Sequence, residues 1–445
     1  MTDETPSNVP RDQGLSTLGL IMQLFGTLSG VLALALIVIL AALGDLQWWG
    51  IIAFALTAVR SKFHADAGAK LPAGFAGIRR YIHVALAHTV AMFAIDVIGF
   101  GGSLRLAIAG AVGLLVWPAA LAVMIRMPRF SRFDAAVPLA EDKGFEGLAI
   151  LMSVMGMTSA IQWGALLLVM LLSLSDIIEL GDIYTIMFMI AVAALFVRSY
   201  IHVTAGLAGV RETNFARSVR LGNRYSIVGF TVALIVTGIL VFFAIFELPD
   251  FLFFALIACA CWMLLAWPMI VRKFVGERQL ASLADNDVHH RAPDAGLTGL
   301  GWLLIANGMM TLSVLLPDLV GGSDAVGASG VMVHFLAKLT LIDPTSVTWN
   351  LGLVAIELWA GIELVRMSSR FRLAATVYAL ATGAWATIHS WPPTSSFHAL
   401  RHLAPEDIFV YVPVATNLVV PVATLLLVRR RTAPTAQARY RPDPS

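Results

Sequence analysis

The sequence predicts an all-α integral membrane protein with about twelve transmembrane helices, arranged as three parallel repeats of a four-helix unit. Three observations predict this fold class: the composition, the placement of basic residues and a set of recurring markers. Of the 445 residues, 58% are apolar and only 13% are charged, and the mean hydropathy is +0.82. A soluble domain carries about a quarter charged residues, so this chain has too few to cover a surface in water.

Apolar runs of span length follow one another along the chain. They lie near residues 16–43, 49–65, 81–100, 104–125, 147–174, 183–205, 225–246, 251–271, 299–317, 348–365, 373–389 and 408–428. Several of them are apolar on all sides, as helices that face lipid must be. The first run follows a polar tail, 1–13, and is too long for the core of a signal peptide, so we interpret it as a retained span.

The basic residues predict how these spans are oriented. With the N-terminus in the cytoplasm, all of the 30 lysines and arginines except Arg105, Lys338 and Arg401 fall in cytoplasmic segments. This assignment counts Arg60 and Arg198 among the cytoplasmic residues. Because basic residues concentrate in cytoplasmic loops, the pattern predicts that both termini lie in the cytoplasm.

Cysteine labelling tests this topology directly. In a variant without the two native cysteines, we expect cysteines at Ser103 and Ser396 to react with an impermeant maleimide in intact cells. Cysteines at Ser218 and Ser368 are expected to react only after the membrane is permeabilised, because the prediction places them inside. An exchange of sides at any of these positions contradicts the topology.

Recurring markers divide the chain into three similar units, 14–130, 144–276 and 296–431, followed by a tail, 432–445. Each unit has a glycine in its first helix, a glycine near the end of its second helix and a proline in its last helix. These markers are Gly26, Gly156 and Gly308, then Gly68, Gly206 and Gly361, then Pro118, Pro268 and Pro421. Units with an even number of spans keep the same orientation, so the repeats are parallel.

Two sets of ionisable residues recur with the repeat and are candidate binding residues. The first set follows the second-helix glycine at a constant distance and comprises Arg79, Arg217 and Arg372. These arginines can bind anionic headgroups or phosphate at the cytoplasmic face, or each can simply anchor its helix at the interface. The second set precedes the same glycine and comprises His64, His202 and Glu357. These residues can converge on a cation or a proton, or each can hydrogen-bond to a neighbouring helix.

The third unit differs from the others by two longer outer loops, 318–347 and 390–407. Four histidines lie in or beside these loops: His334, His389, His398 and His402. His398 and His402 have the i, i+4 spacing that suits a bound zinc or copper ion, with His389, Glu406 or Asp407 as a third ligand. The alternative is a solvated loop with scattered histidines.

No nucleotide-binding, haem-attachment or metalloprotease motif occurs, so the sequence predicts no other cofactor and no nucleic-acid partner. Two functions fit a protein of a bacterial inner membrane. One is a permease or channel-like protein for a small solute or lipid, and the number of spans favours it. The other is a non-catalytic subunit or scaffold that packs against lipid and other membrane proteins. The scarcity of charge expected within the spans favours this second function. A membrane enzyme is a third and less favoured function, because no nucleophile–base pair can be assembled from the sequence.

Overall fold

The computed structural model describes residues 14–42, 48–71, 74–99, 104–127, 130, 145–172, 183–210, 215–246, 265–272, 295–321, 347–390 and 408–430. All elements in these ranges are helical. They are α1 (Leu15–Ala42), α2 (Trp48–Lys70), α3 (Ala76–Ala94), η2 (Ile95–Gly99), α4 (Leu104–Arg126), α6 (Phe145–Leu172), α8 (Ile183–Val210), α9 (Phe215–Phe246), α12 (Ala295–Gly321), α14 (Val347–Arg366), α15 (Phe371–Ser390) and α16 (Ile408–Arg430), with a further helical segment at 265–272. The α-helical class predicted from the sequence is confirmed for this part of the chain.

Each predicted apolar run overlaps one of these helices, but some helices are longer than the runs. α2 continues to Lys70, although its predicted run ends at residue 65, and α9 begins at Phe215, although its run begins at residue 225. The added segments carry arginine, lysine and other polar residues. Hydropathy therefore marks only the apolar part of these helices, and helices often extend beyond it.

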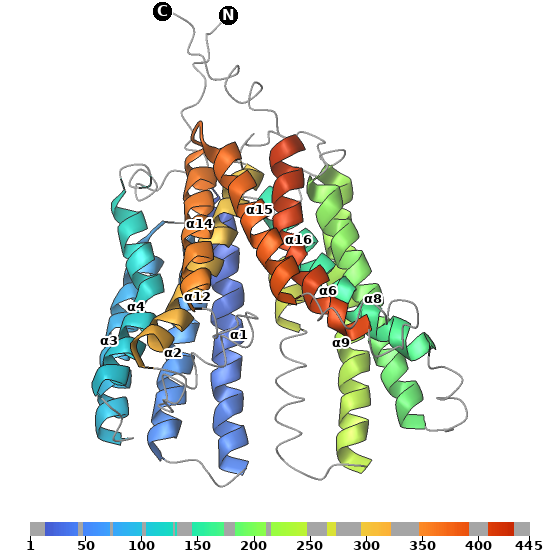
Figure 1. Ribbon diagram of the computed structural model, residues 1–445. Helices are drawn as coiled ribbons and strands as arrows, with labels where there is room; N and C mark the ends of the chain where they lie inside the picture. Colours follow the sequence, from blue (N-terminus) through green and yellow to red (C-terminus); the bar gives the residue numbers. More distant parts are fainter. Residues whose placement is uncertain are drawn as a thin grey trace, which may run out of the picture. The chain divides into compact units, whose positions relative to one another are not determined.

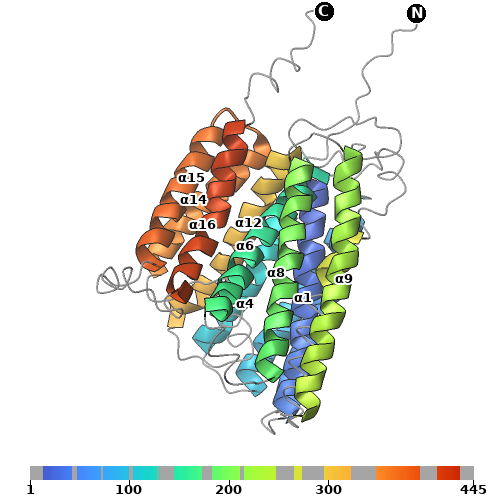
Figure 2. The ribbon, with the colours of Figure 1, turned by 90° about the vertical axis from the view of Figure 1, so that its right-hand side faces the viewer.

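The helices form two compact units. The first unit contains α1 to α4, η2, α12 and α14, and the second contains α6, α8, α9, the segment 265–272, α15 and α16. In the first unit, α2 packs between α1 and α3, α3 packs on α4, and α12 contacts both α1 and α4 (Figure 1). In the second unit, α8 lies beside α9 and α15 beside α16 (Figure 2). The predicted repeats 1 and 2 thus fall in different units, whereas the helices of the predicted repeat 3 are divided between the two.

Six helical stretches in the described residues are long and apolar enough to cross a membrane. They are Leu15–Val38, Ala76–Gly99, Ala107–Arg126, Gly147–Leu172, Thr185–Gly209 and Val219–Ile239. α2 has the length but not the composition, because Arg60, Lys62, Asp66 and Lys70 lie in its second half. Large apolar side chains are also exposed on these helices, such as Val90 (69% exposed), Ile98 (74%) and Leu234 (71%). Exposure of this kind is costly in water and normal against lipid, so the protein is a membrane protein.

Small residues set the spacing between the first and second helix of each predicted repeat. Two contacts recur there: a pair near the start of the first helix, and a glycine farther along it that faces the second helix. The pairs are Gly19 with Gly68, Ala149 with Gly206, and Gly301 with Gly361, and the facing contacts are Gly26 with Ala65, Gly156 with Val203, and Gly308 with Leu358. A Cβ added to Gly19 would lie 2.6 Å from the Gly68 carbonyl oxygen, and one on Gly301 2.8 Å from that of Gly361. Backbones approach this closely in lipid because packing, rather than the hydrophobic effect, holds membrane helices together.

Candidate functional site

His64 joins three helices of the first unit through a cluster of aromatic residues. The indole Nε1–H of Trp117 in α4 donates a hydrogen bond to Nε2 of His64 in α2, at 2.9 Å. The ring of Tyr81, from α3, stacks on the imidazole with 4.7 Å between the ring centroids. Tyr81 is fully buried, whereas His64 and Trp117 are half-buried. Polar atoms from α2 and α4 thus satisfy each other beneath an aromatic ring from α3.

His202 forms the same arrangement in the second unit. Nε1–H of Trp267, in the segment 265–272, donates to Nε2 of His202 in α8 at 2.7 Å. The ring of Tyr225, from α9, stacks on the imidazole at 4.2 Å. Here all three side chains are buried, with His202 5% exposed and Trp267 4% exposed. The His-Tyr-Trp cluster is therefore built twice, each time from three helical segments.

These contacts determine which nitrogen of each histidine is available. Because an indole can only donate, Nε2 of His64 and Nε2 of His202 are acceptors and carry no proton. The remaining hydrogen of a neutral ring then lies on Nδ1. Glu357, the third residue of the predicted set, accepts a hydrogen bond at Oε1 from Nδ2 of Asn307 at 2.9 Å. Each of the three residues is thus hydrogen-bonded to a neighbouring helix, which is the alternative weighed in the sequence analysis.

Arg60 lies one turn before His64 and binds atoms of both α3 and α4. Its NH2 donates to the carbonyl oxygen of Leu114 at 2.9 Å, and its NH1 donates to Nδ1 of His88 at 3.4 Å. Since Nδ1 accepts, Nε2 of a neutral His88 carries the proton and donates to the Thr57 hydroxyl at 3.1 Å, which in turn donates to the Ala53 carbonyl oxygen. The chain of donors and acceptors is complete.

The carbonyl that Arg60 binds is the one that a proline leaves unpaired. Pro118 lies within α4 and has no N–H, so the carbonyl of Leu114, four residues earlier, loses its helical partner. The guanidinium supplies the missing donor. In membrane helices, neighbouring side chains can satisfy such carbonyls. For Pro118 the structure identifies the group as Arg60.

Arg198 has the corresponding position in the second unit, one turn before His202. Its NH2 donates to the hydroxyl of Tyr225 at 3.5 Å. The ring of Pro268 packs against Gly229 of α9, where an added Cβ would lie 2.7 Å from the proline Cγ. Arginine, tyrosine, histidine and a tryptophan–proline pair therefore occur together in both units.

Arg60 contacts residues near the middle of helices that could cross a membrane, and Arg198 lies near the middle of such a helix. Arg60 contacts His88, close to the centre of the stretch Ala76–Gly99, and Leu114, close to the centre of Ala107–Arg126. Arg198 itself lies close to the centre of Thr185–Gly209. α2 and α8 continue past these two arginines to Lys70 and Val210, so both arginines lie within helices. Their assignment to cytoplasmic segments stays a prediction. Charge is present within the helical groups, where the sequence analysis expected little.

The other predicted site residues lie apart from these clusters or outside the described residues. Arg79 is exposed in the first turn of α3, and Arg372 is exposed at the start of α15, where its guanidinium lies 5.9 Å from the ring centroid of Phe371. Arg217 belongs to α9, but its side chain lies outside the described part of the structure, as do the side chain of His389 and the whole of residues 334, 398 and 402. The zinc or copper site therefore stays a prediction. Within the described ranges, no three His, Cys, Asp or Glu side chains form a group that could hold a metal ion.

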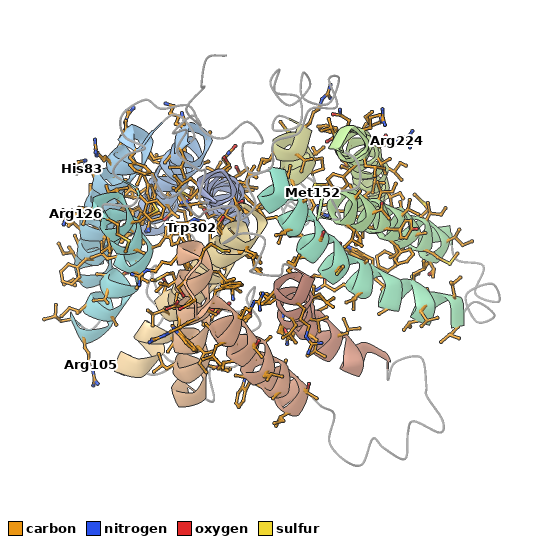
Figure 3. All side chains as sticks on the ribbon, turned by 90° about the horizontal axis from the view of Figure 1, so that it is seen from above. His83, Arg105, Arg126, Met152, Arg224 and Trp302 are labelled. Atoms are coloured by element: carbon orange, nitrogen blue, oxygen red, sulfur yellow. The ribbon has the colours of Figure 1, made fainter. Side chains whose placement is uncertain are left out.

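Figure 3 shows which of the labelled residues lie inside the first unit and which lie at its surface. Trp302 of α12 lies inside, 5% exposed, with its ring 5.9 Å from that of Phe130. His83 and Arg126 lie on the outside of the same unit and are exposed. Arg60 differs from Arg126 because the residue is half-buried and its guanidinium is bound to two other helices.

Sequence reasoning missed Tyr81, Tyr225 and the role of the two tryptophans. Trp117 and Trp267 each precede the recurring proline, and this signal was present but was interpreted as structural. The tyrosines are harder to find, because Tyr81 and Tyr225 follow their second-helix glycines at different distances. Tyr81 lies near the start of α3 and Tyr225 well inside α9, so their equivalence is seen only from the rings stacked on the histidines.

No protein-family model matches the chain, and neither a curated protein nor a solved structure is significantly similar to it. The function is therefore argued from the clusters alone.

Proposed function

We propose that this protein is a permease or channel-like protein of a bacterial inner membrane that moves a small solute or a lipid. The observation that carries the proposal is the pair of arginines, Arg60 and Arg198, each set in a polar cluster near the middle of apolar helices. Ionisable groups at that depth are expensive to bury and usually mark the path of a solute or ion. Substrate sites of transporters lie near the same depth.

The threefold plan is part of the proposal. It is supported by the matching contacts of small residues between the first and second helices of all three predicted repeats. The two His-Tyr-Trp clusters and a hydroxyl pair support it further, since Ser29 bonds Ser61 at 2.9 Å and Ser159 bonds Ser199 at 2.7 Å. On this plan the protein has twelve spans with both termini in the cytoplasm. In the third repeat, Glu357 then has the position of His64 and His202, so a carboxylate replaces the imidazole there.

The alternative is a scaffold subunit that packs against other membrane proteins. It is favoured by the tight backbone contacts at Gly19, Gly26 and Gly68, because helices packed so closely slide past each other only with difficulty. It is also favoured by the closed hydrogen-bond chain from Arg60 to Ala53. A scaffold has no need of a charged group in that chain, however, and this is why we favour the permease.

Transport by purified protein in vesicles tests the proposal. We expect vesicles of phosphatidylcholine and phosphatidylglycerol that contain the protein to release acetate, phosphate or choline, or to move a fluorescent lipid between leaflets, faster than protein-free vesicles. Replacing Arg60 with glutamine should slow the flux about tenfold or more, since a charge-assisted hydrogen bond contributes about 1.5–3 kcal/mol.

Arg126→Gln is the matched control for this flux assay. Arg126 is the last residue of α4 and is exposed, so its loss should leave the rate unchanged. If no solute or lipid moves faster than in protein-free vesicles, the permease is rejected and the scaffold is retained.

A further inference from the structure

We infer that Arg60 is the anchor of a binding site for one oxyanion group, a phosphate or a carboxylate, within the α2–α3–α4 helix group. The inference deepens the proposed function, because the anion is the class of cargo that a permease built around this residue selects. It concerns binding, and binding can be measured without transport.

Arg60 carries a positive charge that no bound carboxylate neutralises among the described residues. Its hydrogen bonds go to the Leu114 carbonyl and to His88, both neutral, and no carboxylate binds it among the described residues. The arginine side chain stays protonated in proteins. A positive charge near the middle of apolar helices is costly, and the groups that bind Arg60 here are neutral, so a bound anion would lower this cost.

The structural role of Arg60 does not require its charge. The Leu114 carbonyl needs only a donor, because Pro118 removes an N–H and not a charge. A neutral amide or hydroxyl would satisfy it at a lower desolvation cost. The structural role therefore accounts for one hydrogen bond of Arg60 but not for its being a cation.

The guanidinium of Arg60 also has the geometry to bind an oxyanion. A guanidinium has five N–H donors, and two of them are used here. His88 and Leu114 hold the group from α3 and α4, so the plane of the remaining donors is fixed. His88 is itself fixed, because its other nitrogen bonds the Thr57 hydroxyl. Fixed and planar donors match the two oxygens of a carboxylate or phosphate, which they bind in bidentate fashion. Arg60 is half-buried, so part of it remains within reach of an ion.

The test measures anion binding to the full-length protein in nanodiscs of phosphatidylcholine, which carries no net charge. One arm uses radiolabelled inorganic phosphate and acetate in equilibrium dialysis. The other arm adds phosphatidylglycerol and counts retained lipid by native mass spectrometry. We expect saturable binding in at least one arm, weakened about tenfold or more by Arg60→Gln and less by Arg60→Lys, which keeps the charge but not the fork.

A second variant guards against a folding defect. In Arg60→Gln/Pro118→Ala, an alanine N–H at position 118 can restore the helical bond to Leu114, so the carbonyl no longer depends on the arginine. We expect this double variant to keep the thermal stability of the wild type but no longer to bind the anion. Pro118→Ala alone, with Arg60 present, should bind as the wild type does, and so should Arg126→Gln.

The outcomes separate the source of the anion and the two proposals. Binding of phosphate or acetate alone identifies a free ion as the ligand, and retention of phosphatidylglycerol alone identifies a lipid headgroup. Equal binding by the wild type and Arg60→Gln/Pro118→Ala, or no binding in either arm, overturns the inference. Arg60-dependent binding without any flux would support the anion site and reject the permease. Flux that does not depend on Arg60, together with no Arg60-dependent binding, would support the permease and reject the anion site.

Discussion

Replacing Gly26 with leucine is expected to prevent α1 and α2 from packing and to remove most of the folded protein. A Cβ at this position would lie 2.5 Å from the amide nitrogen of Ala65 and 2.8 Å from the carbonyl oxygen of Ser61. Both are backbone atoms of α2, so they cannot give way without moving the helix. The cost should therefore reach or exceed the upper end of the roughly 1–3 kcal/mol that overpacking causes. Separation of α2 would also disturb Arg60 and His64, which the same helix carries.

Two other glycines provide the control. An added Cβ at Gly238 of α9 or at Gly352 of α14 meets nothing within 4 Å. Leucine at either position should leave the melting temperature in detergent close to that of the wild type, while Gly26→Leu should elute as aggregate in gel filtration. A melting temperature for Gly26→Leu equal to those of the controls would show that the α1–α2 contact contributes little to folding.

The helices were predictable from the sequence, and their ends were less so. Apolar runs as long as 147–174 admit few structures other than a membrane helix, and α6 covers nearly that range. The end of α2 was missed because Asp66 and Lys70 lower the hydropathy of its last residues without preventing helix formation, since lysine is a good helix former. Residues 66–70 were thereby assigned to the loop that follows.

The candidate site was predictable only in part. His64 and His202 were identified because they keep a constant distance from a glycine in the same helix. Tyr81 and Tyr225 belong to the next helix, Tyr81 near the start of α3 and Tyr225 well inside α9. The spacing from the glycine therefore does not pair the two tyrosines, although it pairs Arg79 with Arg217 in the same two helices. The depth of Arg60 was hidden because it is revealed only by contacts with α3 and α4.

The tryptophan–histidine hydrogen bond should contribute more to stability in the second unit than in the first. Trp267→Phe keeps most of the ring but removes the donor, leaving Nε2 of the buried His202 without its 2.7 Å partner. An unsatisfied buried acceptor costs about 1–3 kcal/mol. Trp117→Phe should cost less, because His64 and Trp117 are half-buried and the bond is longer, 2.9 Å. Melting temperatures of the two purified variants in the same detergent give the comparison, and equal losses would contradict it.

A double-mutant cycle then shows what the second cluster is for. His202→Leu alone leaves the Trp267 donor unsatisfied and should also destabilise the protein. Removing both polar partners, in His202→Leu/Trp267→Phe, should recover part of the loss, because apolar groups of similar size can replace a buried polar pair almost neutrally. The coupling free energy is expected to be about 0.5–3 kcal/mol. If this double variant is stable and still transports, the cluster only holds helices together. If it is stable but no longer transports, the polar atoms of His202 and Trp267 serve the cargo, and the permease is favoured over the scaffold.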